Sequence, residues 1–294
     1  MPEEIASVSV IIPAYRAART IARALQSIAA QTVLPAEIII IDDGSDDGAI
    51  EAAEKMSSVL PGVGLKTFRQ DHKGAGAARN KGVQEATSTY VAFLDADDEW
   101  LPEKLERSLQ EIAKTGSVLV SHNYIMRDSA GRETTVLKCD KNFLAPGDAY
   151  VNLYCKGYIA TSAVVARRDA VIAAGGFDES LPTAQDYALW LSMLEKLETP
   201  FHIFADVLIR YHVTAGSITS HTERRLHCAL RVAKDFYPAL SNRPGIPLFS
   251  LWFRILSVHY EALMAYASQG RYLAALGVAL RFPVTILKLT FAPK

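Results

Sequence analysis

The stretch EIIIIDDGSDDG, residues 37–48, decides the expected fold class of this chain. Its four consecutive isoleucines are too apolar for a half-exposed strand and are typical of a parallel strand that is covered on both faces. The run ends in acidic residues and glycines, which indicate a turn that also caps a helix at about residues 49–58. We therefore expect a buried parallel strand whose carboxyl end carries several carboxylates.

Strand and helix signals alternate on both sides of this stretch. The first part of the chain has strand signals at residues 8–12, 64–69 and 89–94, and helix signals at residues 17–31, 75–86 and 102–114. This alternation predicts an α/β fold with a mainly parallel, Rossmann-like sheet. The later pattern consists of strands at residues 117–126, 134–137, 161–166 and 201–212, a helix at residues 185–197, and helical sequence from His221 onward.

The composition is that of a folded globular protein. Of the 294 residues, 50% are hydrophobic and 21% are charged, which excludes a disordered chain and a fibrous repeat. The formal net charge of −1 provides no global basic field, so we expect no nucleic-acid partner. Three scattered cysteines, Cys139, Cys155 and Cys228, favour free thiols in a reducing compartment over a disulfide framework. The sequence thus predicts a cytoplasmic protein and leaves its oligomeric state open.

Two of the expected strands end in acidic clusters. One cluster contains Asp42 and Asp43, and the other contains Asp95, Asp97 and Asp98. In open α/β sheets ligands bind beyond the carboxyl ends of the strands, where such carboxylates repel one another unless a cation or a donor-rich ligand lies between them. Carboxylate oxygens suit Mg²⁺ or Mn²⁺, which commonly also bind substrate phosphates. The pattern predicts a metal-dependent site for a phosphorylated ligand, although each cluster alone also fits a helix cap or a turn.

Five segments in order carry a family resemblance. They are VSVIIPAY at residues 8–15, IIDDGS at 40–45, HKGAGAARNKG at 72–82, FLDADD at 93–98, and GGFD at 175–178 followed by QDY at 185–187. Together they resemble the family 2 glycosyltransferases with the GT-A fold, over roughly residues 7–219. The resemblance implies inverting transfer of a sugar from a nucleotide donor to a hydroxyl acceptor. It also implies a catalytic domain at residues 1–219, with a nucleotide-binding half at 1–100 and an acceptor-binding half at 101–219.

The resemblance assigns the nucleotide-binding roles to residues near the first two strands. It implies that Pro13, Ala14, Tyr15 and Asp43 border the nucleotide base, and that Asp43 accepts a hydrogen bond from a base N–H. Arg79 is implied to lie near the base and the diphosphate.

The resemblance places the metal and the catalytic base further along the chain. Asp95 is implied to reach the ribose or the metal, directly or through water, Ala96 to border the donor, and Asp97 to bind the metal itself. Asp186 matches the family's catalytic base. Direct displacement needs a carboxylate to take the proton of the attacking hydroxyl and positive charge to stabilise the leaving diphosphate. Asp186 also fits an N-terminal helix cap, and the two roles are compatible.

Two positions depart from the family pattern. Gln185 stands where the family often has Glu, and Thr214 stands where a metal-binding His often follows the last strand. His212 is a possible but weaker substitute as a metal ligand. These departures are the support for one alternative, a non-catalytic nucleotide-sugar-binding scaffold on the same fold. A second alternative is a sugar-phosphate nucleotidyltransferase, but PAYR at residues 13–16 stands where that class has a basic, glycine-rich loop.

The resemblance is less specific about the substrates. It leaves the donor nucleotide open, with UDP expected. It implies a hydroxyl acceptor on a glycan or a lipid-linked glycan, in the assembly of cell-surface polysaccharide or glycolipid. The acceptor pocket is expected to include the segment at residues 138–158.

Residues 220–294 form a helical extension with a different charge. They contain 3 acidic and 10 basic residues, whereas residues 1–219 contain 29 acidic and 21 basic residues. Residues 248–294 are rich in large apolar side chains, and no acid follows Glu261. Such a cationic, aromatic segment favours peripheral contact with an anionic membrane surface, here the inner face of the membrane. Arg281 and Pro283 argue against a spanning helix, and a cap on the catalytic domain or a dimer interface is the alternative.

Overall fold

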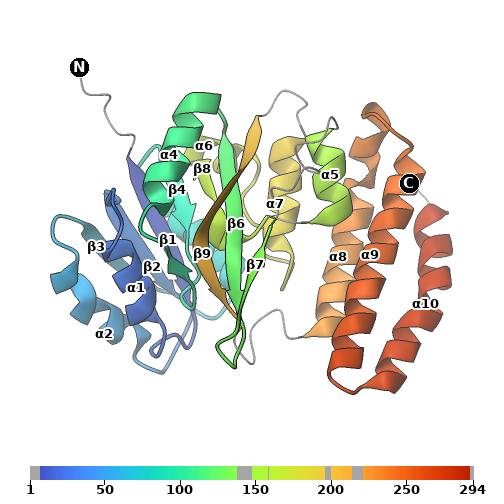
Figure 1. Ribbon diagram of the computed structural model, residues 1–294, viewed down its shortest axis with the longest axis horizontal. Coiled ribbons are helices and arrows are strands. Elements are labelled where there is room, and N and C mark those ends of the chain that lie inside the picture. The colour runs from blue at the N-terminus through green and yellow to red at the C-terminus, as the bar shows by residue number, and fades with distance from the viewer. Residues whose placement is uncertain (1–6, 138–147, 158, 196–199, 214–220, 292–294) are drawn as a thin grey trace.

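A computed structural model describes residues 7–137, 148–157, 159–195, 200–213 and 221–291. Figure 1 shows a twisted sheet with helices on both faces, and three long C-terminal helices side by side at one end of the molecule. The predicted α/β fold and the helical extension are both confirmed.

One sheet runs through the whole α/β part of the molecule. Its strands follow the order β3 (Gly64–Arg69), β2 (Glu37–Asp42), β1 (Val8–Ala14), β4 (Tyr90–Phe93), β8 (Val165–Arg167), β6 (Leu119–Arg127), β9 (Phe201–His212) and β5 (Glu99–Trp100), and β7 (Glu133–Val136) pairs with β6. The strands β3, β2, β1 and β4 are parallel, as predicted, whereas β8 is antiparallel to both β4 and β6. The first half of the sheet is therefore Rossmann-like and the second half is mixed.

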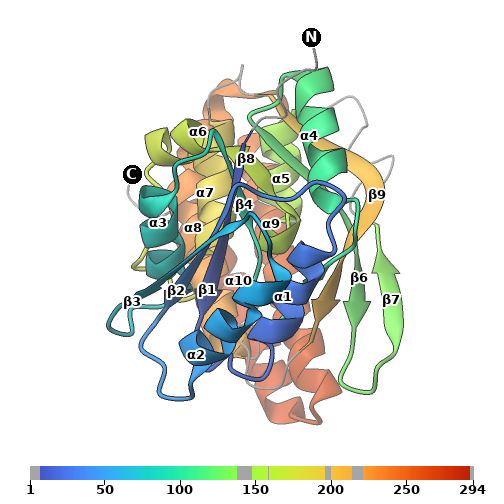
Figure 2. The same cartoon turned by 90° about the vertical axis from the view of Figure 1, so that its left-hand side faces the viewer.

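The helices lie on the two faces of the sheet and in the C-terminal extension. They are α1 (Ile21–Ala29), α2 (Ala49–Glu54), α3 (Ala75–Glu85), α4 (Lys104–Thr115), α5 (Ala149–Lys156), α6 (Arg168–Ala173), α7 (Gln185–Leu194), α8 (Thr222–Phe236), α9 (Pro247–Ser268) and α10 (Tyr272–Thr290). Short 3-10 helices occur at η1 (Lys55–Val59), η2 (Thr161–Ala163) and η4 (Tyr237–Asn242). Figure 2 shows α3 on one side of β1 and β2, and α1 with α2 on the other.

The protein has an apolar core on each face of the sheet, and the isoleucines of β2 contribute to both, as their apolar run predicts. Ile39 and Ile41 belong to the core cluster beneath α3 and α7, and Ile38 and Ile40 belong to the cluster beneath α1, α2 and α4. All four are fully buried because successive side chains of a strand point to opposite faces. The packing of α3 on this sheet is close: a Cβ at Gly82 would lie 2.4 Å from Cγ2 of Ile11.

Several predicted boundaries were wrong. Pro13 lies inside β1 instead of ending it, because β4 pairs with β1 only as far as Ile11 and no strand needs a Pro13 N–H. The expected helix at residues 17–31 is shorter and begins at Ile21. The expected strand at residues 161–166 divides into η2 and β8. The elements β5, α5 and α6 were not predicted at all, since each is short and depends on its tertiary partners.

The C-terminal helices share the core of the α/β part. Val232 of α8 and Leu251 and Ile255 of α9 belong to the same apolar cluster as Trp190 of α7. The inner side of the extension is therefore a packed cap, while α10 lies outermost against α9 and is largely exposed. Among the described residues, Tyr272–Thr290 is the one helix that is long and apolar enough, by length and composition, to cross a membrane. The domain boundaries at residues 100 and 219 stay predictions.

Candidate active site

The two predicted acidic clusters lie at the carboxyl ends of β2 and β4, the two strands that flank β1. Between them lies the end of β1, where the N–H of Asp43 donates to the carbonyl of Ala14 at 2.8 Å. Ala14 is buried and Pro13 is partly buried, so these residues support the start of the Asp43 turn. Their assignment to the nucleotide base stays a prediction.

The carboxylate of Asp43 organises the loop that leads into α3. Its Oδ1 accepts hydrogen bonds from Gln70 Nε2 and from the Lys73 N–H, and its Oδ2 accepts one from the Gly74 N–H, each at 2.8 Å. The Nδ1 atom of His72 lies 2.8 Å from the same Oδ2. A carboxylate has about four acceptor positions. Groups of the protein itself therefore already fill the acceptor positions of Asp43. A base N–H that binds Asp43 would replace one of these donors.

An exposed aromatic pair stands beside Asp43. The ring of Tyr15 is 45% exposed, and it stacks on the His72 ring with centroids 4.2 Å apart and an angle of 26° between the planes. The following residue, Arg16, has a positive φ of 52° and places its guanidinium 5.3 Å from the centre of the Tyr15 ring. Planar aromatic surfaces of this kind are suited to stack with nucleobases.

A buried arginine, Arg79, forms an ion pair with the partly exposed Asp95 beyond the end of β4. Nη2 of Arg79 donates to Oδ1 of Asp95 at 2.6 Å, and the Arg79 guanidinium lies 5.4 Å from the centre of the Phe177 ring. Burial disfavours the Arg79 cation, but nearby carboxylates outweigh burial and raise the pKa of this side chain above its ordinary value. Asp95 contributes most to this effect, and Asp186 and Asp98 contribute as well. The predicted donor-binding arginine and the predicted base therefore lie in one electrostatic environment.

Asp98 is the anchor of the second acidic cluster, a role that the sequence did not indicate. It is fully buried, and its carboxylate accepts hydrogen bonds from Ser162 Oγ at 2.6 Å and from the His212 N–H at 3.1 Å. Burial, together with the carboxylates of Asp95 and Asp97, raises the pKa of Asp98 well above its ordinary value. The same Ser162 Oγ accepts from the Asp95 N–H at 3.1 Å, so η2 and the acidic turn hold each other in place.

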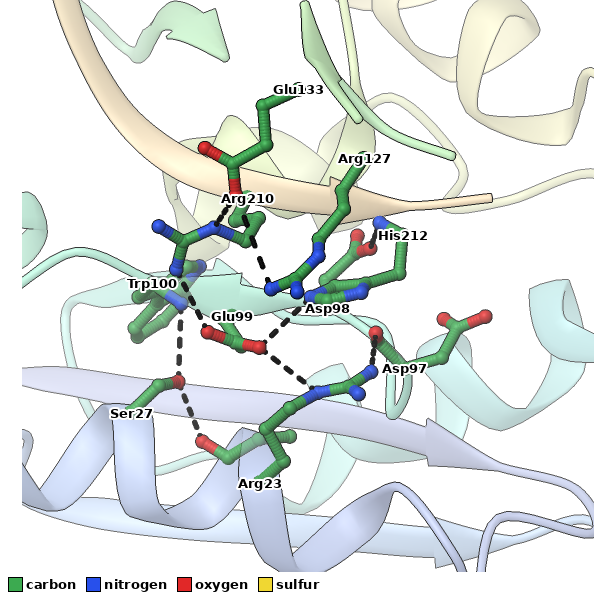
Figure 3. A network of polar contacts seen from close by, with 11 residues as sticks. Arg23, Ser27, Asp97, Asp98, Glu99, Trp100, Arg127, Glu133, Arg210 and His212 are labelled. Atoms are coloured by element: carbon green, nitrogen blue, oxygen red, sulfur yellow. Dashed lines mark hydrogen bonds and ion pairs between the residues drawn. The ribbon is translucent and has the colours of Figure 1, made fainter. Parts of the chain in front are cut away.

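A charged network supports the acidic turn from the side of β5 and β9 (Figure 3). The carboxylate of Glu99 lies 3.1 Å from Arg23 Nε and 3.0 Å from Arg210 Nη1. Arg23 also donates to the backbone carbonyl of Asp97 at 2.6 Å. The network therefore fixes the backbone of the predicted metal-binding residue, and Glu99 and Arg23 are site residues that the sequence reasoning missed.

His212 lies in this network. Its Nε2 atom is 2.9 Å from Oε1 of Glu99, and burial and the Arg23 cation lower its pKa below the ordinary value. A ligand role for His212 would require this nitrogen to exchange Glu99 for the metal. Thr214, the other position in question, lies outside the described residues.

Asp186 lies in the first turn of α7. Its Oδ2 accepts from Thr161 Oγ1 at 2.8 Å, and its Oδ1 accepts from the N–H of Tyr187 at 2.8 Å. Ala184, just before the helix, has a φ of 63°, a strained conformation for a residue with a side chain. Gln185 is buried and packs against α3 at Gly76, so its side chain acts in packing. The two hydrogen bonds fix the orientation of the Asp186 carboxylate.

The carboxylates of this edge suit a divalent cation. Asp95 and Asp97 lie close enough to Asp98 to disfavour its ionised form, and a cation at this edge would relieve that repulsion. No group of three or more His, Cys, Asp or Glu side chains among the described residues encloses a metal site. Mg²⁺ and Mn²⁺ are commonly held by one or two carboxylates with substrate phosphates and water, and the Asp95–Asp97 pair fits that arrangement.

Comparison with known proteins identifies the family. The sequence model named Glycosyl transferase family 2 matches residues 9–171. The chain belongs to this family. The resemblance inferred from the five segments is therefore confirmed, and this glycosyltransferase is not a sugar-phosphate nucleotidyltransferase.

Two curated relatives match over most of their length. The glycosyltransferase is 31% identical over 244 residues to the amylovoran biosynthesis glycosyltransferase AmsB of Erwinia amylovora. This match covers 81% of this chain and 80% of AmsB. It is 28% identical over 231 residues to WfgD of Escherichia coli, named UDP-Glc:alpha-D-GlcNAc-diphosphoundecaprenol beta-1,3-glucosyltransferase, with 78% and 86% coverage. Other relatives are longer: the match to an uncharacterized glycosyltransferase of Rickettsia felis covers 36% of that protein.

Solved structures share the fold. S. aureus TarS in complex with UDP-GlcNAc superposes with a TM-score of 0.68 at 19% identity, covering 94% of this chain and 81% of that one. The mannosyltransferase PcManGT from Pyrobaculum calidifontis, in complex with GDP-Man and Mn²⁺, gives a TM-score of 0.67 at 19% identity, with 100% and 89% coverage. The expected GT-A fold is confirmed.

Proposed function

We propose that this glycosyltransferase moves a hexosyl or related group from a nucleotide-diphosphate donor to a hydroxyl acceptor, with inversion at the anomeric carbon. One observation carries the proposal: the Arg79–Asp95 pair beyond β4 and the Asp186 carboxylate at the start of α7 lie in one electrostatic environment. A diphosphate-binding cation and a base on either side of one reaction centre are the groups that single displacement needs.

In the proposed reaction Asp186 takes the proton of the acceptor hydroxyl. The hydroxyl oxygen forms the new bond to the anomeric carbon while the bond from that carbon to the diphosphate oxygen breaks, and the electron pair leaves with the diphosphate. Thr161 and the Tyr187 N–H each occupy one acceptor position of Asp186, which leaves other lone pairs for the incoming proton. The Arg79 cation favours negative charge on the leaving group.

A divalent ion, Mn²⁺ or Mg²⁺, is part of the proposal. Asp97 would hold it, with Asp95 directly or through water. When bound, such an ion supplies positive charge to the leaving diphosphate. The Mn²⁺ in PcManGT supports this assignment.

We favour UDP as the donor nucleotide. TarS binds UDP-GlcNAc, and the name of WfgD specifies UDP-Glc, whereas PcManGT was solved with GDP-Man. The exposed Tyr15–His72 pair would stack with the base.

The acceptor is proposed to be a glycan or lipid-linked glycan in polysaccharide biosynthesis. AmsB acts in amylovoran biosynthesis, and the acceptor in the WfgD name is a sugar on a diphosphate lipid. An acceptor of this kind presents its reacting hydroxyl near a membrane surface.

Exposed apolar faces of the extension support peripheral contact with the cytoplasmic side of the membrane. Large side chains recur at three- and four-residue spacing on α9 (Phe249, Phe253, Leu256, Tyr260, Met264) and on α10 (Leu273, Leu276, Leu280, Val284, Leu287), and each is between 47% and 87% exposed. Arg281 pairs with Glu223 of α8, with Nη2 2.9 Å from Oε2. This ion pair joins α10 to α8. It favours a helix that lies on the membrane surface over one that spans the membrane.

Donor binding tests the proposal. Thermal unfolding is measured with a panel of UDP, GDP and dTDP sugars, with and without Mn²⁺, for the wild type, Asp97→Asn and the exposed control Glu103→Gln. A donor at 100 times its dissociation constant stabilises the fold by about 2.7 kcal/mol. We expect metal-dependent stabilisation by UDP sugars that Asp97→Asn abolishes and Glu103→Gln retains.

Turnover separates the enzyme from the scaffold alternative. If a donor binds but Asp186→Asn leaves donor consumption unchanged, the catalytic assignment is wrong. Stabilisation that is equal with and without metal would contradict the metal assignment.

A further inference from the structure

A cavity lies on the side of Asp186 that faces the C-terminal helices. It has a volume of about 250 Å³ and is bounded by α7, α8, α9 and the residues after α5. This is many times the roughly 10–15 Å³ that one water molecule requires. Because Asp186 lines it and neither Arg79 nor Asp95 does, the cavity reaches the proposed base without including that ion pair.

Three residues of the cavity wall have a buried side-chain atom with no hydrogen-bond partner. These atoms are Thr183 Oγ1, Trp190 Nε1 and Arg254 Nε. The nitrogen atoms of Trp and Arg are donors only, so each needs an acceptor oxygen. Buried donors without partners are uncommon in folded proteins because each costs roughly 1–3 kcal/mol. The cavity wall therefore holds unused donors just behind its surface, and a ligand with acceptor oxygens would engage them once these side chains shift.

Arg254 also brings a buried positive charge to the cavity wall. The residue is only 6% exposed, and no carboxylate within the described ranges lies within ion-pair distance of it. Its guanidinium lies 4.6 Å from the centre of the Tyr187 ring and packs against Gly157, where a Cβ would come within 2.9 Å of Nη2. Neither neighbour carries a full negative charge. A buried cation without a counter-charge is costly, and a bound anion offsets that cost.

The other charged groups of the cavity are already paired or assigned. Arg225 lies 3.8 Å from Glu261, so these two largely neutralise each other. Asp186 is held by Thr161 and is the proposed base. Of the two cations that line the cavity, Arg254 is therefore the one that forms no ion pair with a described residue.

The position of Arg254 favours a phosphate as the anion. Arg254 belongs to α9, which packs along α10 and carries part of the exposed apolar surface. The phosphate of a lipid-linked acceptor lies between its apolar chain and its sugar. Arg254 comes from a helix that carries part of that apolar surface, and it lines the same cavity as Asp186. The planar guanidinium also matches phosphate oxygens in geometry.

We propose that the cavity between α7 and the C-terminal helices binds the phosphate group of the acceptor, with Arg254 as its counter-charge. This proposal rests on the proposed function, since it makes Asp186 the base that meets the acceptor. It gives the C-terminal extension a role in acceptor binding.

Calorimetric titration of the full chain with inorganic pyrophosphate tests the proposal. EDTA is included, so that metal-dependent binding at the Asp95–Asp97 edge does not contribute. We expect Arg254→Met to weaken binding about tenfold or more, because a hydrogen-bonded charge pair is lost. Arg224→Met, which removes an exposed cation of α8 outside the cavity, is the matched control and should leave the affinity unchanged.

A second variant guards against misfolding of Arg254→Met. Ala229→Met places a longer side chain in the cavity wall while Arg254 is retained, and it should weaken pyrophosphate binding as well. Thermal unfolding establishes that each variant is folded. No binding to the folded wild type at millimolar pyrophosphate, or equal binding to wild type and Arg254→Met, would overturn the proposal.

Three further outcomes test the place of the anion, its chemistry and its independence from the proposed function. Loss of pyrophosphate binding in Asp97→Asn but not in Arg254→Met would place the anion at the donor edge and overturn the cavity assignment. Arg254-dependent binding of sodium glucuronate in place of pyrophosphate would overturn the assignment to phosphate. Nucleotide-sugar binding is measured on the same samples. If pyrophosphate binds through Arg254 while no nucleotide sugar binds, the cavity site stands and the proposed function fails.

Discussion

Replacing Asp43 with Asn tests whether this buried carboxylate holds the loop at residues 70–74. Four donors surround its two oxygens: Gln70 Nε2, His72 Nδ1 and the N–H groups of Lys73 and Gly74. An asparagine offers one oxygen and one NH₂ group in their place. In either orientation of the amide, the N–H of Lys73 or that of Gly74 faces another N–H group.

The expected cost follows from that mismatch. A lost hydrogen bond to a charged acceptor costs roughly 1.5–3 kcal/mol, and a donor left without a partner costs more if it is buried. We therefore expect Asp43→Asn to lower the free energy of unfolding by about 2–4 kcal/mol. Asp46→Asn is the matched control in the same turn, because its side chain is 85% exposed and its ion pair with Arg16 is long at 3.9 Å. Its expected cost is within about 0.5 kcal/mol.

Urea denaturation gives the two free energies, and hydrogen exchange of the Lys73 and Gly74 amides reports on the loop itself. Faster exchange at these two amides in Asp43→Asn, with the sheet unaffected, is the expected result. If Asp43→Asn is as stable as Asp46→Asn and the amides stay protected, the carboxylate does not hold the loop. Unchanged stability together with lost nucleotide binding would instead support the base-binding role implied by the family resemblance.

Three further predictions concern the fold, the reaction and the membrane. Burial raises the pKa of Glu37, but hydrogen bonds from Lys66, Ser9 and Thr87 outweigh burial and lower this pKa from 4.5 to about 2. The ionised Glu37 therefore stabilises the fold above pH 4.5, and this contribution is lost as the pH falls toward 2. Glu37→Gln should therefore cost about 3 kcal/mol at pH 7 and flatten the acid side of the stability curve, as measured by urea denaturation at several pH values; an acid side that is unchanged in the variant would contradict this. Asp186→Asn should reduce turnover by roughly 10²–10⁴ and leave donor affinity unchanged, and a proportional loss of both would show that Asp186 acts in folding or donor binding instead. Leu276→Glu with Leu280→Glu should abolish co-sedimentation with phosphatidylglycerol vesicles, whereas the exposed change Gln110→Glu should not; vesicle binding that survives the double change would rule out the α10 face as the membrane contact.

Local sequence determined the α/β class and much of the site. The isoleucine run at β2 has no polar face, so its strand had to be covered on both sides, and the structure divides its side chains between two cores. The strands at Gly64–Arg69 and Phe201–His212 follow their predicted limits because their patterns are long and end in turn residues. The acidic ends of β2 and β4 likewise marked one edge of the sheet, since the parallel strands of one sheet have their carboxyl ends at the same edge.

Only the tertiary structure decided which residues support and complete that edge. Asp98 resembled its acidic neighbours in sequence, yet it is buried by Ser162 and the His212 N–H, which come from segments far along the chain. Glu99 became the centre of a charged network only because β5 pairs with β9. The cavity with Arg254 had no sequence signal, because burial of a single arginine depends on helices that meet across the fold. Periodicity records which face of an element is buried, but contacts between distant elements arise only when the chain has folded.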